Sequence, residues 1–124
     1  MTLEELTGYI LDSFEAECDR SFENDPTVAV FKRVDNKKWF ALAKNIGRRY
    51  LGLEGDGRID ILNVKLNPRS VAALRTREGF LPAWRTNQNS WITVLLDGTV
   101  SDAEISELLE EGFAHAGGKG SKKR

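Results

Sequence analysis

The sequence contains a single cysteine, Cys18, and a single histidine, His115. One cysteine cannot form an internal disulfide, and one histidine without a cysteine partner cannot complete a common zinc site or a Ser-His-Asp triad. No neighbour in the sequence would activate Cys18 as a nucleophile, so we interpret it as a residue that fills the core. We therefore expect no catalytic residue, no metal site and no cofactor.

Long apolar runs are also missing. No stretch of about 18 apolar residues is present, which excludes a hydrophobic membrane-spanning helix. The acidic N-terminal region lacks the basic segment of a signal peptide. We expect a cytoplasmic monomer that does not bind membranes. Of the 124 residues, 40% are hydrophobic and 30% charged, which predicts one globular domain over residues 1–116. Residues 117–124 are predicted to form a basic disordered tail.

Charge is unevenly distributed along the chain, although the net charge is only −1. Residues 1–31 carry a net charge of −7, residues 32–85 carry +8 and residues 86–118 carry −6. If the acidic flanks fold as helices on one side of a sheet formed by the middle, the protein has a basic face that attracts polyanions. The alternative is a mixed surface on which helices and strands compensate each other. The isoelectric point of 5.9 is lower than that of most dedicated DNA-binding domains.

Helices are predicted near both ends of the domain, with a short one in the middle. The predicted ranges are 2 to between 14 and 17, 67–79, and 102–116. Thr2 is a candidate N-cap of the first helix, and Asn67 with Pro68 has the pattern of a helix start. Ser101 and Glu104 form the capping-box pattern before the last helix.

Strands are predicted in the middle of the chain, over residues 28–34, 39–43, 59–66 and 91–96. The first two form a hairpin. In the third, Leu62 and Val64 are predicted to face the core, whereas Asn63 and Lys65 face outward. The fourth is apolar on both sides with Thr93 as its one polar residue, which is typical of a strand inside a sheet. The sequence therefore predicts the α+β class.

A polar loop over residues 85–90 lies between two tryptophans and is the first candidate for ligand recognition. Aromatic residues among lysines and arginines are typical of proteins that stack the bases of single-stranded nucleic acids. Most aromatic residues of a small domain form its core instead. We assign Trp39 and Trp91 to the core, while Trp84 can serve either role.

Several segments occur together in an order and spacing known from one family. They are Tyr50-Leu51-Gly52-Leu53, Leu62-Asn63-Val64-Lys65-Leu66-Asn67-Pro68, Ala83-Trp84, Asn87 and Trp91-Ile92-Thr93-Val94-Leu95-Leu96-Asp97-Gly98. Together they resemble the MmcQ/YjbR-like proteins, small bacterial domains. The resemblance implies an antiparallel sheet flanked by helices in a frataxin-like (CyaY-like) arrangement. It also implies a DNA-binding "double wing" module without enzymatic activity.

The loop before the last strand departs from the family pattern. Only Asn87 is kept between the aromatic residues, and two lysines and two histidines of the pattern are absent. Fewer cations are thus available in the loop for phosphates, although asparagine and glutamine side chains can still read base edges.

We predict a non-catalytic nucleic-acid-binding module whose partner is DNA. The residues predicted to contact phosphates are Lys37, Lys38, Lys44, Arg48, Arg49, Lys65 and Arg85. Those predicted to approach bases are Trp84, Asn87 and Gln88. Cations at the hairpin can instead protect a sheet edge from aggregation. The alternative function is an adaptor that binds a protein or a small ligand through the same loop. The DNA hypothesis requires the cations of residues 32–85 to converge on one exposed patch beside the loop.

Overall fold

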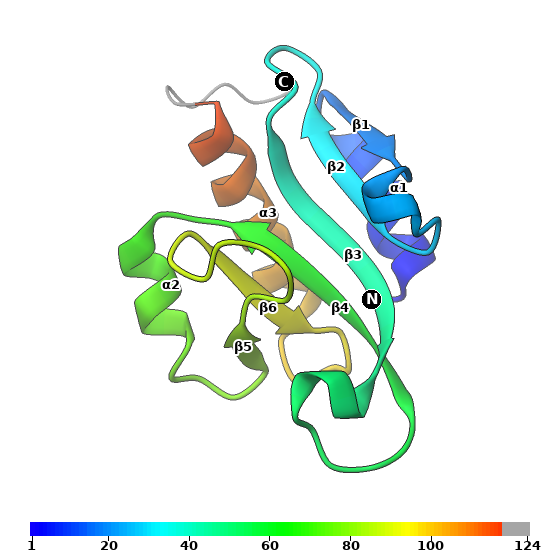
Figure 1. Ribbon diagram of the computed structural model, residues 1–124. Coiled ribbons are helices and arrows are strands. Elements are labelled where there is room, and N and C mark those ends of the chain that lie inside the picture. Colours follow the sequence, from blue (N-terminus) through cyan, green and yellow to red (C-terminus); the bar gives the residue numbers. More distant parts are fainter. Residues whose placement is uncertain (118–124) are drawn as a thin grey trace.

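The computed structural model describes residues 1–117, which form a six-stranded antiparallel sheet and three α-helices (Figure 1). The strands are β1 (Ala16–Asp19), β2 (Ala29–Arg33), β3 (Trp39–Gly47), β4 (Arg58–Lys65), β5 (Phe80–Pro82) and β6 (Trp91–Leu95). The helices are α1 (Leu3–Ser13), α2 (Pro68–Leu74) and α3 (Asp102–Ala116), with the 3₁₀ turns η1 (Phe22–Asn24) and η2 (Arg48–Leu51). The predicted α+β class is confirmed, and the frataxin-like part of the expectation stays a prediction. Most of the predicted tail, from residue 118 on, lies outside the described residues.

The strands lie in the order β1-β2-β3-β4-β6-β5. All five residues of β6 are buried between β4 and β5, as the run apolar on both sides predicted. The edge strands β1 and β5 were not predicted. β1 has only four residues, two of them acidic, and β5 has three and ends in Pro82, which cannot donate to a ladder. Neither segment is long enough to give a periodic apolar pattern.

The predicted helix N-caps are present. The side chains of Thr2, Asn67 and Ser101 accept hydrogen bonds of 3.1, 2.9 and 3.1 Å from backbone amides three residues later. The middle helix is shorter than predicted and ends at Leu74. The amide of Arg77 donates to the carbonyl of Leu74, three residues back, and this turn stops the α-helix.

Helices α1 and α3 pack on one face of the sheet, the helix face; α3 passes behind β3 and β4 in Figure 1. The rings of Phe14 and Phe113 join the two helices with their centroids 5.0 Å apart. A Cβ atom at Gly112 would lie 2.8 Å from the carbonyl oxygen of Lys65, so glycine is required for α3 to approach β4 this closely. Cys18 is partly buried against this core, as predicted.

A β-bulge in β3 places two consecutive residues, Phe40 and Ala41, on the helix face. Phe31 pairs with Ala41 and Lys32 pairs with Trp39, so Phe40 is the extra residue of the bulge. Phe40 packs into the helix-face core and is fully buried.

The prediction that Trp39 belongs to the core was wrong. Displaced by the bulge, Trp39 contacts the ring of Phe22 at 5.6 Å between centroids and is 37% exposed. Sequence periodicity cannot reveal an inserted residue, which explains the error. Trp91 is buried, as predicted.

The other face of the sheet, the open face, is covered by loops. Phe22, Leu51, Leu53 and Trp84 pack on it. Asn63 points to this face, away from Leu62 and Val64, but it is fully buried, so the expectation of an outward, solvent-facing position is corrected. Its position is covered by the loop that follows β5.

Candidate functional site

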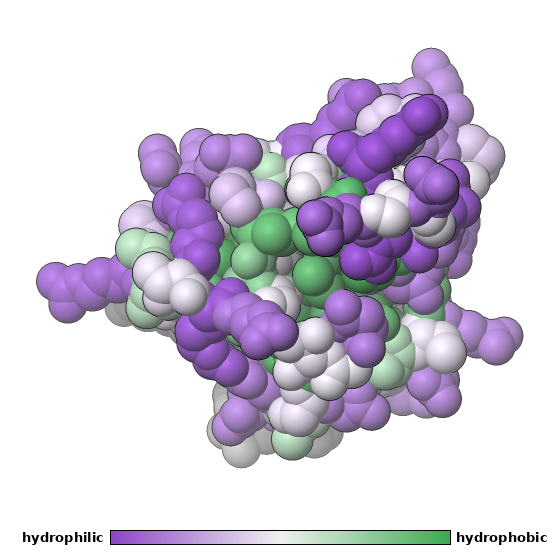
Figure 2. Space-filling view, turned by 90° about the horizontal axis from the view of Figure 1, so that it is seen from below, coloured by the Kyte–Doolittle hydropathy of each residue, from purple (hydrophilic) through white to green (hydrophobic). Residues whose placement is uncertain are grey.

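The candidate site is a groove at the rim of the open face, where the end of β3, η2, the start of β4 and the loop after β5 meet. One part, with a volume of about 470 Å³, is lined by residues that include Lys44, Tyr50, Arg58, Trp84 and Arg85. Two further hollows share Tyr50 and extend toward Arg49 and Gln88. We call the surface formed by Lys44, Arg49, Tyr50, Arg58, Trp84 and Arg85 the Tyr50 groove. Figure 2 views the molecule from the end where η2 lies. On this side, apolar residues lie in the hollows of the surface and hydrophilic residues surround them.

Tyr50 is the most exposed large hydrophobic residue of the described chain, with 65% of its surface accessible. The ring rests against Gly47, at which an added Cβ would lie 3.1 Å from the ring atom Cδ2. The guanidinium of Arg49 lies 5.1 Å from the ring centroid and donates to the phenolic oxygen at 3.3 Å. This hydrogen bond, assisted by the charges of Arg49 and Arg58, lowers the pKa of Tyr50. Tyr50 is thus an exposed ring in a cationic environment.

Trp84 forms the opposite wall of the groove. Its ring packs on Phe22 and has Lys44 and Arg85 at 5.9 and 5.5 Å from its centroid. Arg85 has a left-handed backbone conformation, with φ of 58°. The backbone of Trp84 is held by hydrogen bonds to Asn63 and Thr93 of the sheet, which fix the point from which the indole extends.

Two carboxylates reach into the groove from the segment between β1 and β2. Asp25 accepts a hydrogen bond of 3.0 Å from Lys44, and Glu23 forms an ion pair with Arg85. Hydrogen bonds from Thr27 and then Lys44 lower the pKa of Asp25 to about 2, so it is ionised at neutral pH.

Arg49 and Arg58 have no ion-pair partner among residues 1–117. The guanidinium of Arg58 donates to the neutral side chain of Asn45 at 2.5 Å and to its carbonyl at 3.0 Å. Four cations and three carboxylates line the groove and leave it with a net charge of +1. The third carboxylate, Asp56, lines the same hollow as Arg49 and Arg58.

The structure brings together only part of the predicted site. Lys44, Arg49, Trp84 and Arg85 form the groove, and Gln88 lines the adjoining hollow. Arg48 is next to the groove, but its Nε donates to the carbonyl of Glu54 at 2.8 Å.

The remaining predicted residues lie elsewhere. Lys37 and Lys38 are in the turn before β3 and Lys65 is at the end of the antiparallel β4, so all three are at the opposite end of these strands. Lys37 is paired with Glu17 at 2.8 Å. Asn87 uses its side-chain oxygen to accept the amide of Asn89, which stabilises the loop itself. The cations of residues 32–85 therefore do not gather on one patch.

The sequence did not single out Arg58, Glu23 or Asp25, and it named Tyr50 only as an aromatic residue in a segment of the family resemblance. The available signal for Tyr50 was its position after two arginines and before Gly52, which adopts a left-handed conformation and ends η2. Arg58 carries no such signal, because its place beside Asn45 follows from the pairing of β3 with β4.

Over residues 1–117, no helix has both the length and the apolar character needed to cross a membrane.

Comparisons with known proteins place the chain in a family. Residues 5–115 match the family model described as YjbR. The uncharacterized protein YyaQ of Bacillus subtilis (strain 168) is 34% identical over 113 residues, which cover 91% of this chain and 96% of YyaQ.

Solved structures have the same fold. A crystal structure of a protein from Pseudomonas syringae has a TM-score of 0.88 and 35% identity, and the match covers 94% of this chain and 99% of that one. The crystal structure of Deinococcus radiodurans protein DR2400 has a TM-score of 0.73 at 24% identity, covering 98% and 83% of the two chains, and supports the fold alone. From the family match and the similarity to YyaQ, we conclude that the chain belongs to the YjbR family.

Proposed function

We propose that the protein is a non-catalytic module that binds single-stranded nucleic acid, including single-stranded DNA, in the Tyr50 groove. The observation that carries the proposal is the exposed ring of Tyr50 beside the guanidinium groups of Arg49 and Arg58. Proteins that bind single strands combine such rings, on which bases stack, with cations that follow the phosphates.

The shape of the groove supports an unstacked base as the ligand. Tyr50 and Trp84 line the same hollow of about 470 Å³, and Lys44 and Arg58 line it as well. A base can stack on Tyr50 while its phosphates contact Arg49 and Arg58. Gln88 is exposed beside Trp84, and its side-chain nitrogen donates to the carbonyl of Ala83 at 3.3 Å, so its side-chain oxygen can accept a hydrogen bond from a base edge.

The carboxylates of Glu23 and Asp25 favour a single strand over a duplex. A duplex carries one negative charge per about 1.7 Å of its axis. Its regular backbone would meet Glu23 and Asp25 as well as the cations. A flexible single strand can place a few phosphates on Arg49 and Arg58 and direct its bases away from the acids.

Fluorescence anisotropy with a labelled oligothymidylate and a duplex of equal length tests this proposal. We expect the single strand to bind more tightly, with the affinity falling about sevenfold between 50 and 200 mM salt if two phosphates are neutralised. Tyr50→Ala and Arg58→Gln should each weaken binding about tenfold. Arg75→Gln is the matched control, because Arg75 is exposed at the end of α2 and outside the groove.

A second candidate function is the binding of a small ligand or a protein segment in the same groove. The pairing of Asp25 with Lys44 and of Glu23 with Arg85 favours it, because a ligand that carries both charges could replace each pair. Absence of oligonucleotide binding at low salt, to single and double strands alike, would leave this candidate in place of the first.

A further inference from the structure

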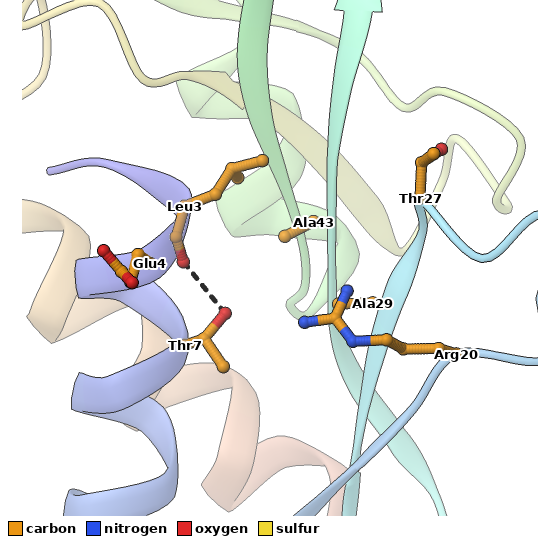
Figure 3. A pocket seen from close by; sticks show the side chains of 7 residues that line it. All are labelled: Leu3, Glu4, Thr7, Arg20, Thr27, Ala29 and Ala43. Atoms are coloured by element: carbon orange, nitrogen blue, oxygen red, sulfur yellow. Dashed lines mark hydrogen bonds between the residues drawn. The ribbon is translucent and has the colours of Figure 1, made fainter.

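A second pocket, on the helix face, lies between the start of α1 and the neighbouring strands β2 and β3. Its volume is about 310 Å³, and its wall includes Leu3, Thr7, Arg20, Ala29 and Ala43 (Figure 3). None of these residues belongs to the Tyr50 groove. This volume is at the lower end of the range found for small-molecule sites.

The pocket exists because two alanines are paired at this point of the sheet, whereas neighbouring pairs contain larger residues. Ala29 of β2 and Ala43 of β3 are directly opposite each other, whereas the next pair along this face includes Phe31. Both alanines are buried, with 3% and 2% of their surface exposed. Two methyl groups leave the space beneath Leu3 unfilled, so the base of the pocket is apolar.

Arg20 supplies a charged donor at the mouth of this pocket. Arg20 directly follows β1, which ends at Asp19, and lines the pocket together with Ala29. Figure 3 shows its guanidinium over Ala29, directed toward α1. Within the described part of the chain, Arg20 has no ion-pair partner.

The hydroxyl groups of Thr7 and Thr27, which also line the pocket, donate to acceptors within the protein. Thr7 donates to the carbonyl of Leu3 at 2.9 Å, and Thr27 donates to Asp25 at 2.5 Å. An acceptor that enters the pocket therefore meets the guanidinium of Arg20. A carboxylate matches the planar, bidentate geometry of that group.

We propose that this pocket binds a small aliphatic monocarboxylate. Its hydrocarbon chain lies on Ala29, Ala43 and Leu3, and its carboxylate binds Arg20. Glu4 is also part of the pocket wall, so a negative charge is favourable only beside Arg20 and a second one on the ligand is disfavoured. This site is on the opposite face of the sheet from the Tyr50 groove, and the two are joined through Thr27, which donates to Asp25 and accepts from Lys44.

Titration of the ¹⁵N-labelled chain with 4-methylvalerate, followed by amide chemical shifts, tests the proposal. We expect saturable shifts at Leu3, Thr7, Ala29 and Ala43, with a dissociation constant on the order of a millimolar, as suits so small a ligand. Arg20→Met and the neutral ligand 4-methylvaleramide should each weaken binding about tenfold. Arg75→Met, a change at an exposed arginine outside the pocket, should leave the affinity unchanged.

Ala43→Phe and the smaller change Ala29→Val fill the pocket and should abolish or weaken binding while the remaining amide spectrum keeps its native pattern. If either variant is folded and binds as well as the parent chain, the location of the site is wrong. Equal affinity for the acid and its amide contradicts the role of Arg20. Tighter binding of leucine than of 4-methylvalerate overturns the monocarboxylate assignment in favour of an amino acid.

Discussion

Asn63 of β4 donates a hydrogen bond of 2.6 Å from its side-chain nitrogen to the main-chain carbonyl oxygen of Trp84. The side-chain oxygen of Asn63 accepts the hydroxyl of Thr93 at 2.5 Å, and Thr93 in turn accepts the amide of Trp84 at 2.9 Å. Both groups of the Trp84 backbone are therefore bound to two buried polar residues of adjacent strands. This closed set of hydrogen bonds attaches one wall of the Tyr50 groove to the sheet.

Replacement of Asn63 by alanine should lower the free energy of unfolding by about 2–4 kcal/mol. The variant leaves the buried hydroxyl of Thr93 and the carbonyl of Trp84 without their partner, and each unsatisfied group costs about 1–3 kcal/mol. Urea unfolding measures the change. Asn89→Ala is the control, because Asn89 is exposed in the same loop, and it should alter stability by less than about 0.5 kcal/mol. Similar stabilities of the two variants would contradict the importance of the Asn63 network.

Gly47→Ala should weaken oligonucleotide binding without destabilising the fold. The new Cβ would lie 3.1 and 3.2 Å from two ring atoms of Tyr50, which is exposed and able to move. The backbone of Gly47 is extended, with φ of −64°, so alanine adopts it without strain. We expect binding to fall as it does in Tyr50→Ala, together with changed NMR shifts of the Tyr50 ring.

The matched control is Gly8→Ala, since an added Cβ there meets no atom within 4 Å. Alanine at this position of α1 should raise stability by up to about 1 kcal/mol and leave binding unchanged. Undiminished oligonucleotide affinity of Gly47→Ala, with a displaced Tyr50 ring, would show that the ring does not contact the ligand.

The positions of the predicted strands and helices along the chain could be obtained from the sequence, because each of these elements has a strong local signal. The run from Trp91 to Leu95 is apolar on both sides, and α3 follows a serine cap over the predicted range. The burial of Asn63 could not be obtained, because alternation gives the side on which a residue lies and not what covers that side. Trp84, in the loop that covers Asn63, lies 21 residues later in the chain.

The types of residue in the groove could be predicted from the sequence, but not which particular residues form it. Arginines and aromatic residues of the middle segment were candidates, yet only the pairing of β3 with β4 sets Arg58 opposite Gly47, near Tyr50. The same pairing separates Lys65 from Lys44 along the strands. The acids Glu23 and Asp25 come from a segment with little periodicity, which folds over the open face as η1 and the turn after it.

Asp25 should make stability depend on pH in the acid range. Its pKa is about 2 in the folded protein and 3.8 ordinarily, because Thr27 and Lys44 donate hydrogen bonds to the ionised form. A lowered folded-state pKa means that this stabilisation is present above about pH 4 and is lost as the pH falls through 2. The melting temperature of Asp25→Asn should thus be below that of the parent at pH 6 and approach it toward pH 2. Asp56→Asn, a change at an exposed carboxylate, should give a difference that does not depend on pH in this way.

Glu23→Gln should distinguish the two candidate functions of the groove. If phosphates bind there, removal of the carboxylate frees Arg85 and raises the affinity for oligothymidylate severalfold at low salt. The slope of the logarithm of affinity against the logarithm of salt concentration should become steeper by about 0.7, the value for one more phosphate contact on a single strand. A ligand that uses the carboxylate of Glu23 predicts the reverse, a loss of affinity in the same variant. Glu107→Gln, on the exposed side of α3, controls for the change in net charge, because it is remote from the groove. An equal gain in affinity in Glu23→Gln and Glu107→Gln would show that the effect comes from the overall net charge and that Arg85 does not contact the ligand.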